Sequence, residues 1–255
     1  MQGVATARRR IVRINDWLEQ KVGPARTNIH DAYRAELAKS VSIAQNRGVE
    51  RANATRALHF GSGRDKHGLG ALVQTQGASV IALDPDVDGL KINPANFKVI
   101  GDGTKLPFQD GSFDLVFSEF TFEDVRHPWD ALSEIHRVLK SHGSFVVLVP
   151  NRKHYYAWIT RMTPFWFHRA YLRAGGSKTT DIDTFPTEYK WGALSDIHLA
   201  GERLQWNLIA VHSAPGPTTY TKWLPIHLPF ILLDRVLARW QSQHLTYVAC
   251  FRKTA

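Results

Sequence analysis

The chain has 255 residues, of which 44% are hydrophobic, and its 32 Lys and Arg against 23 Asp and Glu give a formal net charge of +9. This composition is typical of a globular protein with a large core, and the lone Cys250 excludes a disulfide framework or a cysteine zinc cluster. No apolar run reaches the roughly 18 residues that span a bilayer, and the N-terminus has no secretory signal. We therefore expect a cytoplasmic protein, with peripheral membrane contact as an alternative.

The first fifty residues are predicted to form two helices. The segment "IVRINDWLEQKV" gathers four apolar residues on one face at helical spacing. These are Ile11, Ile14, Trp17 and Leu18. A second helix is expected in "NIHDAYRAELAKSVSIAQNRG", with Asn28 as its N-cap and Gly48 as its stop.

From residue 55 onward, short apolar runs alternate with longer amphipathic segments. The predicted strands are "RALHF", "SVIALD", "FKVIGD", "FDLVFSEF" and "SFVVLVPN". Helices are expected in "KHGLGALVQTQGA" and in "PWDALSEIHRVLKSHG". Such alternation predicts a parallel sheet with helices on both faces.

After Asn151 the chain becomes rich in aromatic residues and arginine, and it closes with an amphipathic helix, "PFILLDRVLARW", and strands in "WNLIAVHSA" and "LTYVACFRK". We expect four parts. They are an N-terminal helical lid (1–50), a cofactor-binding core (51–151), an aromatic-rich cap insertion (152–190), and the last helices and strands of the sheet (191–255).

The turn "HFGSG" follows the first predicted strand of the core. Its glycines, Gly61 and Gly63, let the backbone approach a ligand closely, although a tight strand-to-helix turn is an equally good explanation. Asp84 ends the next strand, where a carboxylate can accept hydrogen bonds from a ribose hydroxyl pair. The alternative for Asp84 is a turn or capping residue before Pro85.

Two longer blocks connect these features to a known family. The stretches "VIGDGTKLPFQDGSFDLVFSEF" and "EDVRHPWDALSEIHRVLKSHGSFVVLVPN" resemble the class I S-adenosylmethionine-dependent methyltransferases, of the type 11 kind, over residues 52–151. The resemblance implies an α/β, Rossmann-like, seven-stranded, mostly parallel sheet with a reversed last hairpin. It also implies S-adenosyl-L-methionine as cofactor and S-adenosyl-L-homocysteine as product.

The resemblance implies a set of cofactor-binding residues. They are His59, Gly61, Ser62, Gly63, Asp65, Asp84, Pro85, Asp102, Gly103, Ser118 and Glu119. In this set the glycines line the methionine and ribose end, Asp84 holds the ribose hydroxyls, and Asp102 accepts from the adenine amino group. The family usually has an acidic residue at the position of His59 and a third glycine at that of Asp65. We hypothesise that Asp65 supplies a carboxylate to the cofactor's ammonium group from the other side of the loop.

The family has no common catalytic residue that could be assigned to a position in this sequence, so candidates near the methyl acceptor are chosen by their position. Candidate catalytic residues follow the fourth core strand: Glu119, Glu123 and His127. Candidate substrate-binding residues lie in the lid and the cap: His30, Tyr33, Tyr155, Trp158, Trp166 and His168. For each of them, an ordinary surface, capping or core role is the competing interpretation. The histidines show no H-x-x-x-H or HExxH pairing, so no metal is expected.

The favoured function is methyl transfer to an oxygen of a small molecule or a sugar. One alternative is a membrane-surface methyltransferase with a lipid-linked acceptor, since Arg161, Arg169 and Arg173 lie beside aromatic residues and "WLPIHLPFILL" is apolar. A non-catalytic binding scaffold is another. A nicotinamide dehydrogenase would want a third glycine where Lys66 stands, and the dispersed basic residues argue against nucleic acid. The oligomeric state stays open.

Overall fold

The computed structural model describes residues 2–24, 28–51, 54–164, 166, 167, 170, 187–216, 225 and 227–255. The chain divides into two compact units, and each is described by itself. The sheet unit comprises residues 29–152, 187–212 and 247–255, and the helical unit comprises residues 1–28, 153–186 and 213–246. His168, Arg169 and Arg173 lie outside the described residues, as do Trp223, Leu224 and Ile226 of "WLPIHLPFILL".

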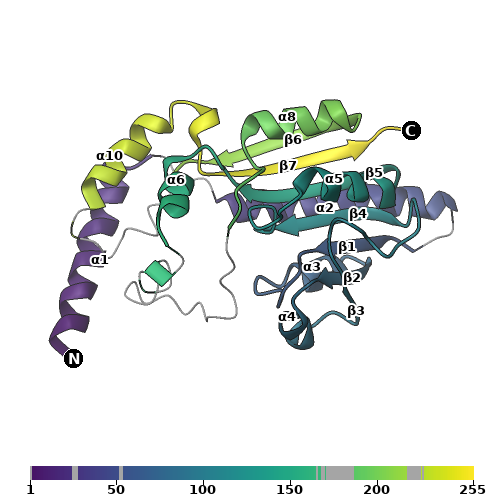
Figure 1. Ribbon diagram of the computed structural model, residues 1–255, viewed down its shortest axis with the longest axis horizontal. Helices are drawn as coiled ribbons and strands as arrows, with labels where there is room; N and C mark the ends of the chain where they lie inside the picture. The colour runs from purple at the N-terminus through teal and green to yellow at the C-terminus, as the bar shows by residue number, and fades with distance from the viewer. Residues whose placement is uncertain are drawn as a thin grey trace. The chain divides into compact units, whose positions relative to one another are not determined.

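A seven-stranded sheet has the strand order β3-β2-β1-β4-β5-β7-β6. Its strands are β1 (Arg56–Phe60), β2 (Ser79–Asp84), β3 (Phe97–Ile100), β4 (Phe113–Glu119), β5 (Leu139–Pro150), β6 (Trp206–Ala214) and β7 (Thr246–Lys253). The first five strands pair in parallel, whereas β6 and β7 run in opposite directions (Figure 1). The predicted fold class, a mostly parallel sheet with a reversed last hairpin, is confirmed.

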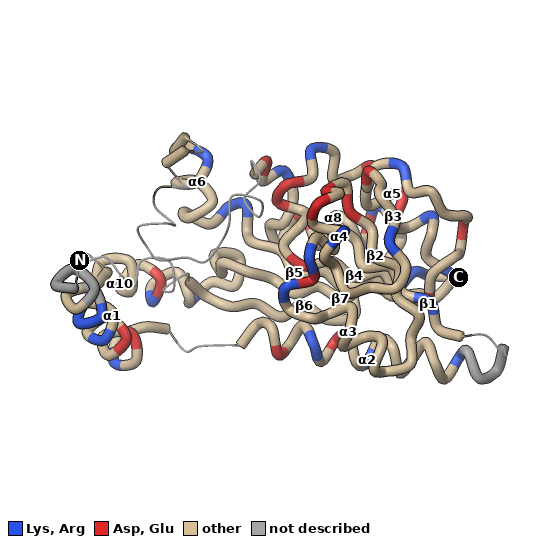
Figure 2. Tube along the Cα trace, turned by 90° about the horizontal axis from the view of Figure 1, so that it is seen from below, with Lys and Arg blue, Asp and Glu red and all other residues tan. Residues whose placement is uncertain are grey.

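Helices cover both faces of this sheet. They are α2 (Ile29–Arg51), α3 (Leu69–Thr75), α4 (Val87–Ile92), α5 (Pro128–Val138) and α8 (Leu194–Arg203). Figure 2 shows α2 and α3 on one side of the strands and α5 and α8 on the other. Helix α5 ends at Val138, before the predicted end at Gly143, because Leu139 already pairs with Phe113 of β4.

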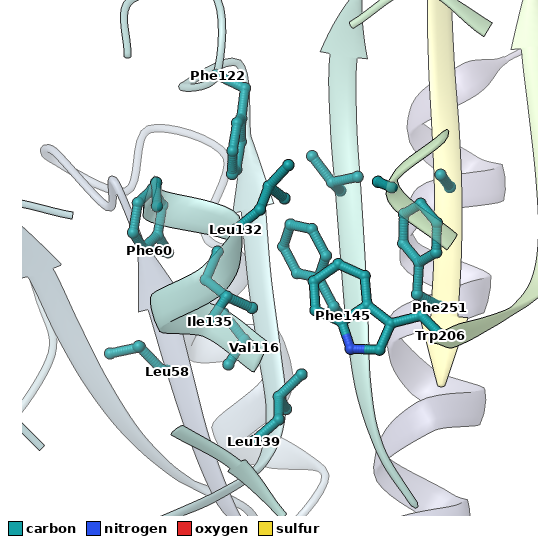
Figure 3. Close-up of a cluster of buried hydrophobic side chains, with 14 of the residues drawn as sticks. Leu58, Phe60, Val116, Phe122, Leu132, Ile135, Leu139, Phe145, Trp206 and Phe251 are labelled. Carbon is teal, nitrogen blue, oxygen red and sulfur yellow. The ribbon is translucent and has the colours of Figure 1, made fainter. Parts of the chain in front are cut away.

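The main hydrophobic core lies between the sheet and the helices α5 and α8. Helix α5 has Pro128 at its first position and buries Leu132, Ile135 and Val138, which recur at helical spacing. These side chains meet an aromatic group that includes Phe145 of β5 and Phe251 of β7, whose rings stack 6.0 Å apart (Figure 3). This packing holds the strand ends in fixed positions, and the site depends on those positions.

Helix α2 belongs to the sheet unit, so the boundaries differ from the predicted lid of residues 1–50. It buries Tyr33, Leu37 and Val41, which are spaced four residues apart, and it packs against β4 and β5. Burial of this apolar stripe accounts for the difference, since only α1 (Gln2–Val22) remains in the other unit.

The helical unit contains α1, α6 (Tyr155–Met162), α10 (His227–Leu237) and the short 3-10 helix η2 (Gln241–Gln243). Helices α1 and α10 pack together, and Arg235 donates a hydrogen bond of 2.8 Å to the carbonyl of Val22. The predicted apolar face of α1 is largely at the surface, because Ile14 and Trp17 are exposed. Within the described residues, no helix is both long and apolar enough to cross a membrane.

Candidate functional site

The glycine turn after β1 is held against the end of β2. The backbone N–H groups of Gly61 and Ser62 both donate to the carbonyl of Leu83, at 2.9 and 3.1 Å. Gly61 has φ +67°, and a Cβ there would lie 2.1 Å from a Thr121 side-chain atom. Only glycine fits this conformation and this space, so the turn brings the backbone to the carboxyl ends of the strands.

Asp84, at the end of β2, is fixed beside this turn. One carboxylate oxygen accepts from the N–H of Gly63 at 2.7 Å, and the other accepts from the N–H of Asp86 at 2.8 Å. Burial raises the pKa of Asp84, and the two N–H donors partly oppose that rise. A carboxylate held beside a glycine backbone, at the carboxyl end of a parallel strand, is suited to accept hydrogen bonds from a vicinal diol. Pro85 follows directly.

Asp65 closes the far end of the same loop. Its carboxylate accepts from the N–H groups of Leu69 and Gly70, at 2.8 and 3.0 Å, so it caps the N-terminus of α3. The same carboxylate lies 4.0 Å from Nδ1 of His59, whose ring stacks 4.4 Å from that of Phe117. Burial lowers the pKa of His59 to about 4, so this imidazole is neutral at pH 7. The acidic side chain of this loop is therefore Asp65, next to α3, and not a residue at position 59.

Asp102 and Gly103 follow β3. Asp102 is exposed, and its carboxylate accepts from the N–H of Thr104 at 2.9 Å. A Cβ at Gly103 would lie 2.3 Å from the ring of Phe60, which ends β1. The glycine thus allows the loop after β3 to pack against the first strand, and it leaves the Asp102 side chain at the surface.

Ser118 and Tyr33 form a buried contact at the end of β4. The Tyr33 hydroxyl donates to the Ser118 carbonyl at 2.8 Å, and neither residue has exposed surface. In this structure Tyr33 anchors α2 to β4 and does not face solvent. The hydroxyl oxygens of Ser62 and Ser118 are buried, and neither has a hydrogen-bond partner among the described residues.

Glu119, the last residue of β4, lies between two histidines. One carboxylate oxygen is 3.1 Å from Nδ1 of His30, and the other is 2.7 Å from Nδ1 of His67. Burial alone would raise the pKa of Glu119, but the hydrogen bonds from His30 and His67 outweigh it and lower the pKa. Sequence reasoning selected His30 and Glu119 separately and missed His67, because no local spacing connects three residues on three different elements.

The residues after β4 differ in exposure. Glu123 is buried, and burial together with neighbouring Asp124 raises its pKa well above the usual range. Asp124 has its pKa raised to about 7, also by burial. His127 is exposed at the N-cap position of α5, without a side-chain capping bond. Of the three catalytic candidates, Glu123 is buried, Glu119 is partly buried and His127 is a surface residue.

Among the predicted cap residues, those described lie in the helical unit. The Tyr155 hydroxyl donates to Asp234 at 2.8 Å, which ties α6 to α10. Trp158 and Trp166 are 62% and 69% exposed. These two side chains are therefore not part of a hydrophobic core, which was the competing interpretation for them.

Comparison with known proteins finds a family model that matches part of the sheet unit. Residues 58–147 match the family model described as a methyltransferase domain, which confirms the resemblance seen in the sequence. The match includes the glycine turn and every predicted cofactor-binding residue.

Several curated proteins are similar over part of the chain. A demethylmenaquinone methyltransferase of Renibacterium salmoninarum is 41% identical over 75 residues, which are 28% of this chain and 32% of the relative. The corresponding protein of Paenarthrobacter aurescens is 28% identical over 175 residues, covering 59% and 66%. The mitochondrial 2-methoxy-6-polyprenyl-1,4-benzoquinol methylase of Mus musculus is 48% identical over 50 residues, covering 20% and 15%. These matches span less than two thirds of each relative's length.

Solved structures show the same fold at low sequence identity. A putative sarcosine dimethylglycine methyltransferase from Galdieria sulphuraria has a TM-score of 0.51 at 14% identity, over 85% of this chain and 86% of the other. A putative S-adenosylmethionine-dependent methyltransferase from Listeria monocytogenes has a TM-score of 0.53 at 14% identity, over 80% and 92%. At such identities the likeness is one of fold.

Proposed function

Because residues 58–147 form a methyltransferase domain of the class I fold, we propose that the protein transfers a methyl group from S-adenosylmethionine to an acceptor molecule. The observation that carries this proposal is the Asp84 carboxylate, fixed by the N–H groups of Gly63 and Asp86 beside the glycine turn. In this proposal the carboxylate holds the ribose hydroxyls of the cofactor, and it is supported by the rule that open α/β sheets bind their ligands at the carboxyl ends of the strands.

The other residues of the edge have proposed roles in the same cofactor site. The turn from Gly61 to Gly63, with Ser62, approaches the methionine and ribose part, and Asp65 beside His59 offers a carboxylate to the ammonium group. Asp102 and Gly103 border the adenine, and Pro85 follows the ribose-binding carboxylate. Ser118 and Glu119 end β4 at the methyl-donating side.

When bound, the cofactor supplies an electrophilic methyl group on a sulfonium sulfur. The task of the chain is then to align the acceptor with that methyl and to exclude water. For a hydroxyl acceptor, a nearby group must take up the proton, and Glu119, Glu123 and His127 are the candidates. We propose an acceptor oxygen on a small molecule or sugar as the first class to test.

A second acceptor class, a lipid-linked molecule, is favoured by the surface of the helical unit. Helix α10 exposes Leu228, Leu232 and Val236 at a spacing of four residues, and Trp240, which follows the end of the helix, is exposed as well. Trp158 and Met162 of α6 and Ile14 and Trp17 of α1 are exposed as well. Exposed apolar side chains that recur along one helix face are a feature of surfaces that contact membranes or partners.

Basic residues accompany these apolar faces. Arg13, Arg161 and Arg239 are exposed on or beside α1, α6 and α10. An apolar face flanked by arginine suits the boundary of an anionic lipid leaflet. Two groups of proteins are similar to part of this chain: the demethylmenaquinone methyltransferases and the polyprenyl-benzoquinol methylases. The name of the second group includes a polyprenyl chain, which supports including lipid-linked acceptors in the test.

The function is tested with the purified chain in two steps. Calorimetry first measures binding of S-adenosylmethionine and S-adenosylhomocysteine. Mass spectrometry then follows methyl transfer into three acceptor pools: small-molecule phenols, sugars, and lipid extracts presented in vesicles. A methylated product in any pool supports the enzyme, and the pool identifies the acceptor class. Cofactor binding without any product, or no cofactor binding, favours a non-catalytic scaffold and contradicts the proposal.

Vesicle co-sedimentation separates the acceptor classes independently of turnover. A lipid-linked acceptor predicts that the chain sediments with anionic vesicles at low salt and is released as salt rises. Leu232→Ser with Trp240→Ser should weaken this binding without changing cofactor affinity. A chain that stays in the supernatant at low salt would exclude the membrane-surface alternative.

A further inference from the structure

Three potential metal ligands converge at the end of β4 in the sheet unit. His30 is the second residue of α2, His67 lies in the loop before α3, and Glu119 is the last residue of β4. Their ligand atoms all lie within 4.8 Å of one another. Three elements that are far apart in the sequence thus bring two imidazole nitrogens and one carboxylate close together.

The donor set has the chemistry of a transition-metal site. Two imidazole nitrogens and one carboxylate suit Zn²⁺, and such ions lie about 2.0–2.2 Å from nitrogen and oxygen ligands. Tetrahedral ligands at those distances are roughly 3.3 Å apart. The Glu119 oxygens are now 3.1 and 2.7 Å from Nδ1 of His30 and His67. The three ligand atoms lie within 4.8 Å of one another. Reaching a spacing of roughly 3.3 Å therefore needs movements of at most about 1.5 Å, which two partly exposed imidazoles can make by side-chain rotation.

The segments that carry these three side chains are anchored by other contacts, and the two imidazoles are accessible to solvent. His67 follows Asp65, whose carboxylate caps α3, and His30 begins the helix that Tyr33 anchors to β4. The side chain of Glu119 is 9% exposed, while those of His30 and His67 are 40% and 48% exposed. A rigid carboxylate with accessible imidazoles provides both preorganisation and an entry path for an ion.

We propose that His30, His67 and Glu119 form a binding site for one divalent transition-metal ion, with Zn²⁺ as the best match. Three protein ligands leave a fourth coordination position, which in metal sites of this kind is filled by water or a substrate atom. The proposal does not depend on methyl transfer, because the ion is bound by the chain alone.

The test uses the full chain, freed of affinity tags and treated with a chelator, with neither cofactor nor acceptor present. Zn²⁺ binding is measured by calorimetry, and Co²⁺ is added as a spectroscopic probe whose visible absorption reports four-coordination. The variants are Glu119→Gln, His67→Ala and His30→Ala, with His198→Ala as the matched control, since His198 is an exposed histidine on α8. Thermal midpoints show whether each variant folds, and His67→Gln replaces the alanine variant if that one does not.

We expect one Zn²⁺ per chain, a Co²⁺ spectrum of four-coordinate type, and an affinity weakened about tenfold or more in each of the three ligand variants. The His198→Ala variant should bind as the wild type does. The proposal is overturned if the wild type binds no Zn²⁺, or if Glu119→Gln binds it with unchanged affinity.

Discussion

Nδ1 of His59 lies 4.0 Å from the Asp65 carboxylate, across the loop that joins β1 to α3. The two residues occupy the positions where the family usually has an acid and a glycine. In the structure the Asp65 carboxylate lies within reach of the His59 ring, so the loop holds an acidic side chain close to the position of the family's usual acid. The same carboxylate also caps α3, so one side chain connects the stability of the loop to its proposed ligand.

Asp65→Ala should therefore affect both stability and cofactor binding. Loss of the cap is expected to cost about 1 kcal/mol of unfolding free energy, measured by urea denaturation. Loss of the charge should weaken S-adenosylmethionine binding in calorimetry. Asp65→Asn is the control, since an amide oxygen can still cap α3 while it offers no charge to the ammonium group. Unchanged cofactor affinity in Asp65→Ala would remove the proposed ammonium contact.

Asp84→Ala should weaken S-adenosylmethionine binding by about tenfold or more, because hydrogen bonds to a charged acceptor contribute about 1.5–3 kcal/mol. Asp86→Ala serves as the comparison. The Asp86 side chain caps α4, whereas its backbone N–H, which contacts Asp84, survives the substitution. The comparison variant should lose stability and keep its affinity. If both variants bind like the wild type, the cofactor site has been assigned to the wrong residues.

His154 predicts acid sensitivity of the helical unit. Its Nδ1 accepts from the N–H of Tyr156 at 3.2 Å at the start of α6, and burial, with a smaller contribution from His244, lowers its pKa to about 4. The unfolded chain takes up a proton near pH 6.5, so stability should fall as the pH decreases from 6.5 towards 4. At pH 5 the expected loss is about 2 kcal/mol relative to pH 7.

His154→Asn keeps a capping oxygen and removes the titrating group. Urea unfolding at pH 7 and pH 5 should therefore show a smaller stability difference for this variant than for the wild type. Equal differences in the two proteins would mean that His154 does not titrate in this range.

Asp124 predicts the opposite pH dependence in the sheet unit. Burial raises its pKa to about 7, so the folded chain retains a proton that the unfolded chain releases near pH 4. Stability should fall as the pH rises from 4 to 7, by at most about 1.4 kcal/mol per pH unit. Asp124→Asn should flatten this dependence in urea unfolding at pH 5 and pH 8. Asp130→Asn, at an exposed position in the same region, should leave it unchanged.

The fold could be predicted because its signals are local. Short apolar runs such as "FDLVFSE" and "VVLVP" are buried almost throughout, as central parallel strands should be, and the spacing of Leu132, Ile135 and Val138 placed a helix correctly. Local patterns were less informative at boundaries and faces. Strand pairing ended α5 early, and the apolar face predicted for α1 turned out to be exposed at Ile14 and Trp17.

The sequence by itself determined the order of strands and helices, the glycine turn and the acid that follows it, since each depends on neighbouring residues or on a family pattern. Only the tertiary structure decided which distant side chains meet. Asp65 reaches His59 because the loop folds back to cap α3, and Glu119 meets His30 and His67 because α2, the same loop and β4 converge at one sheet edge. Contacts across such sequence distances are set by packing, which no local pattern records.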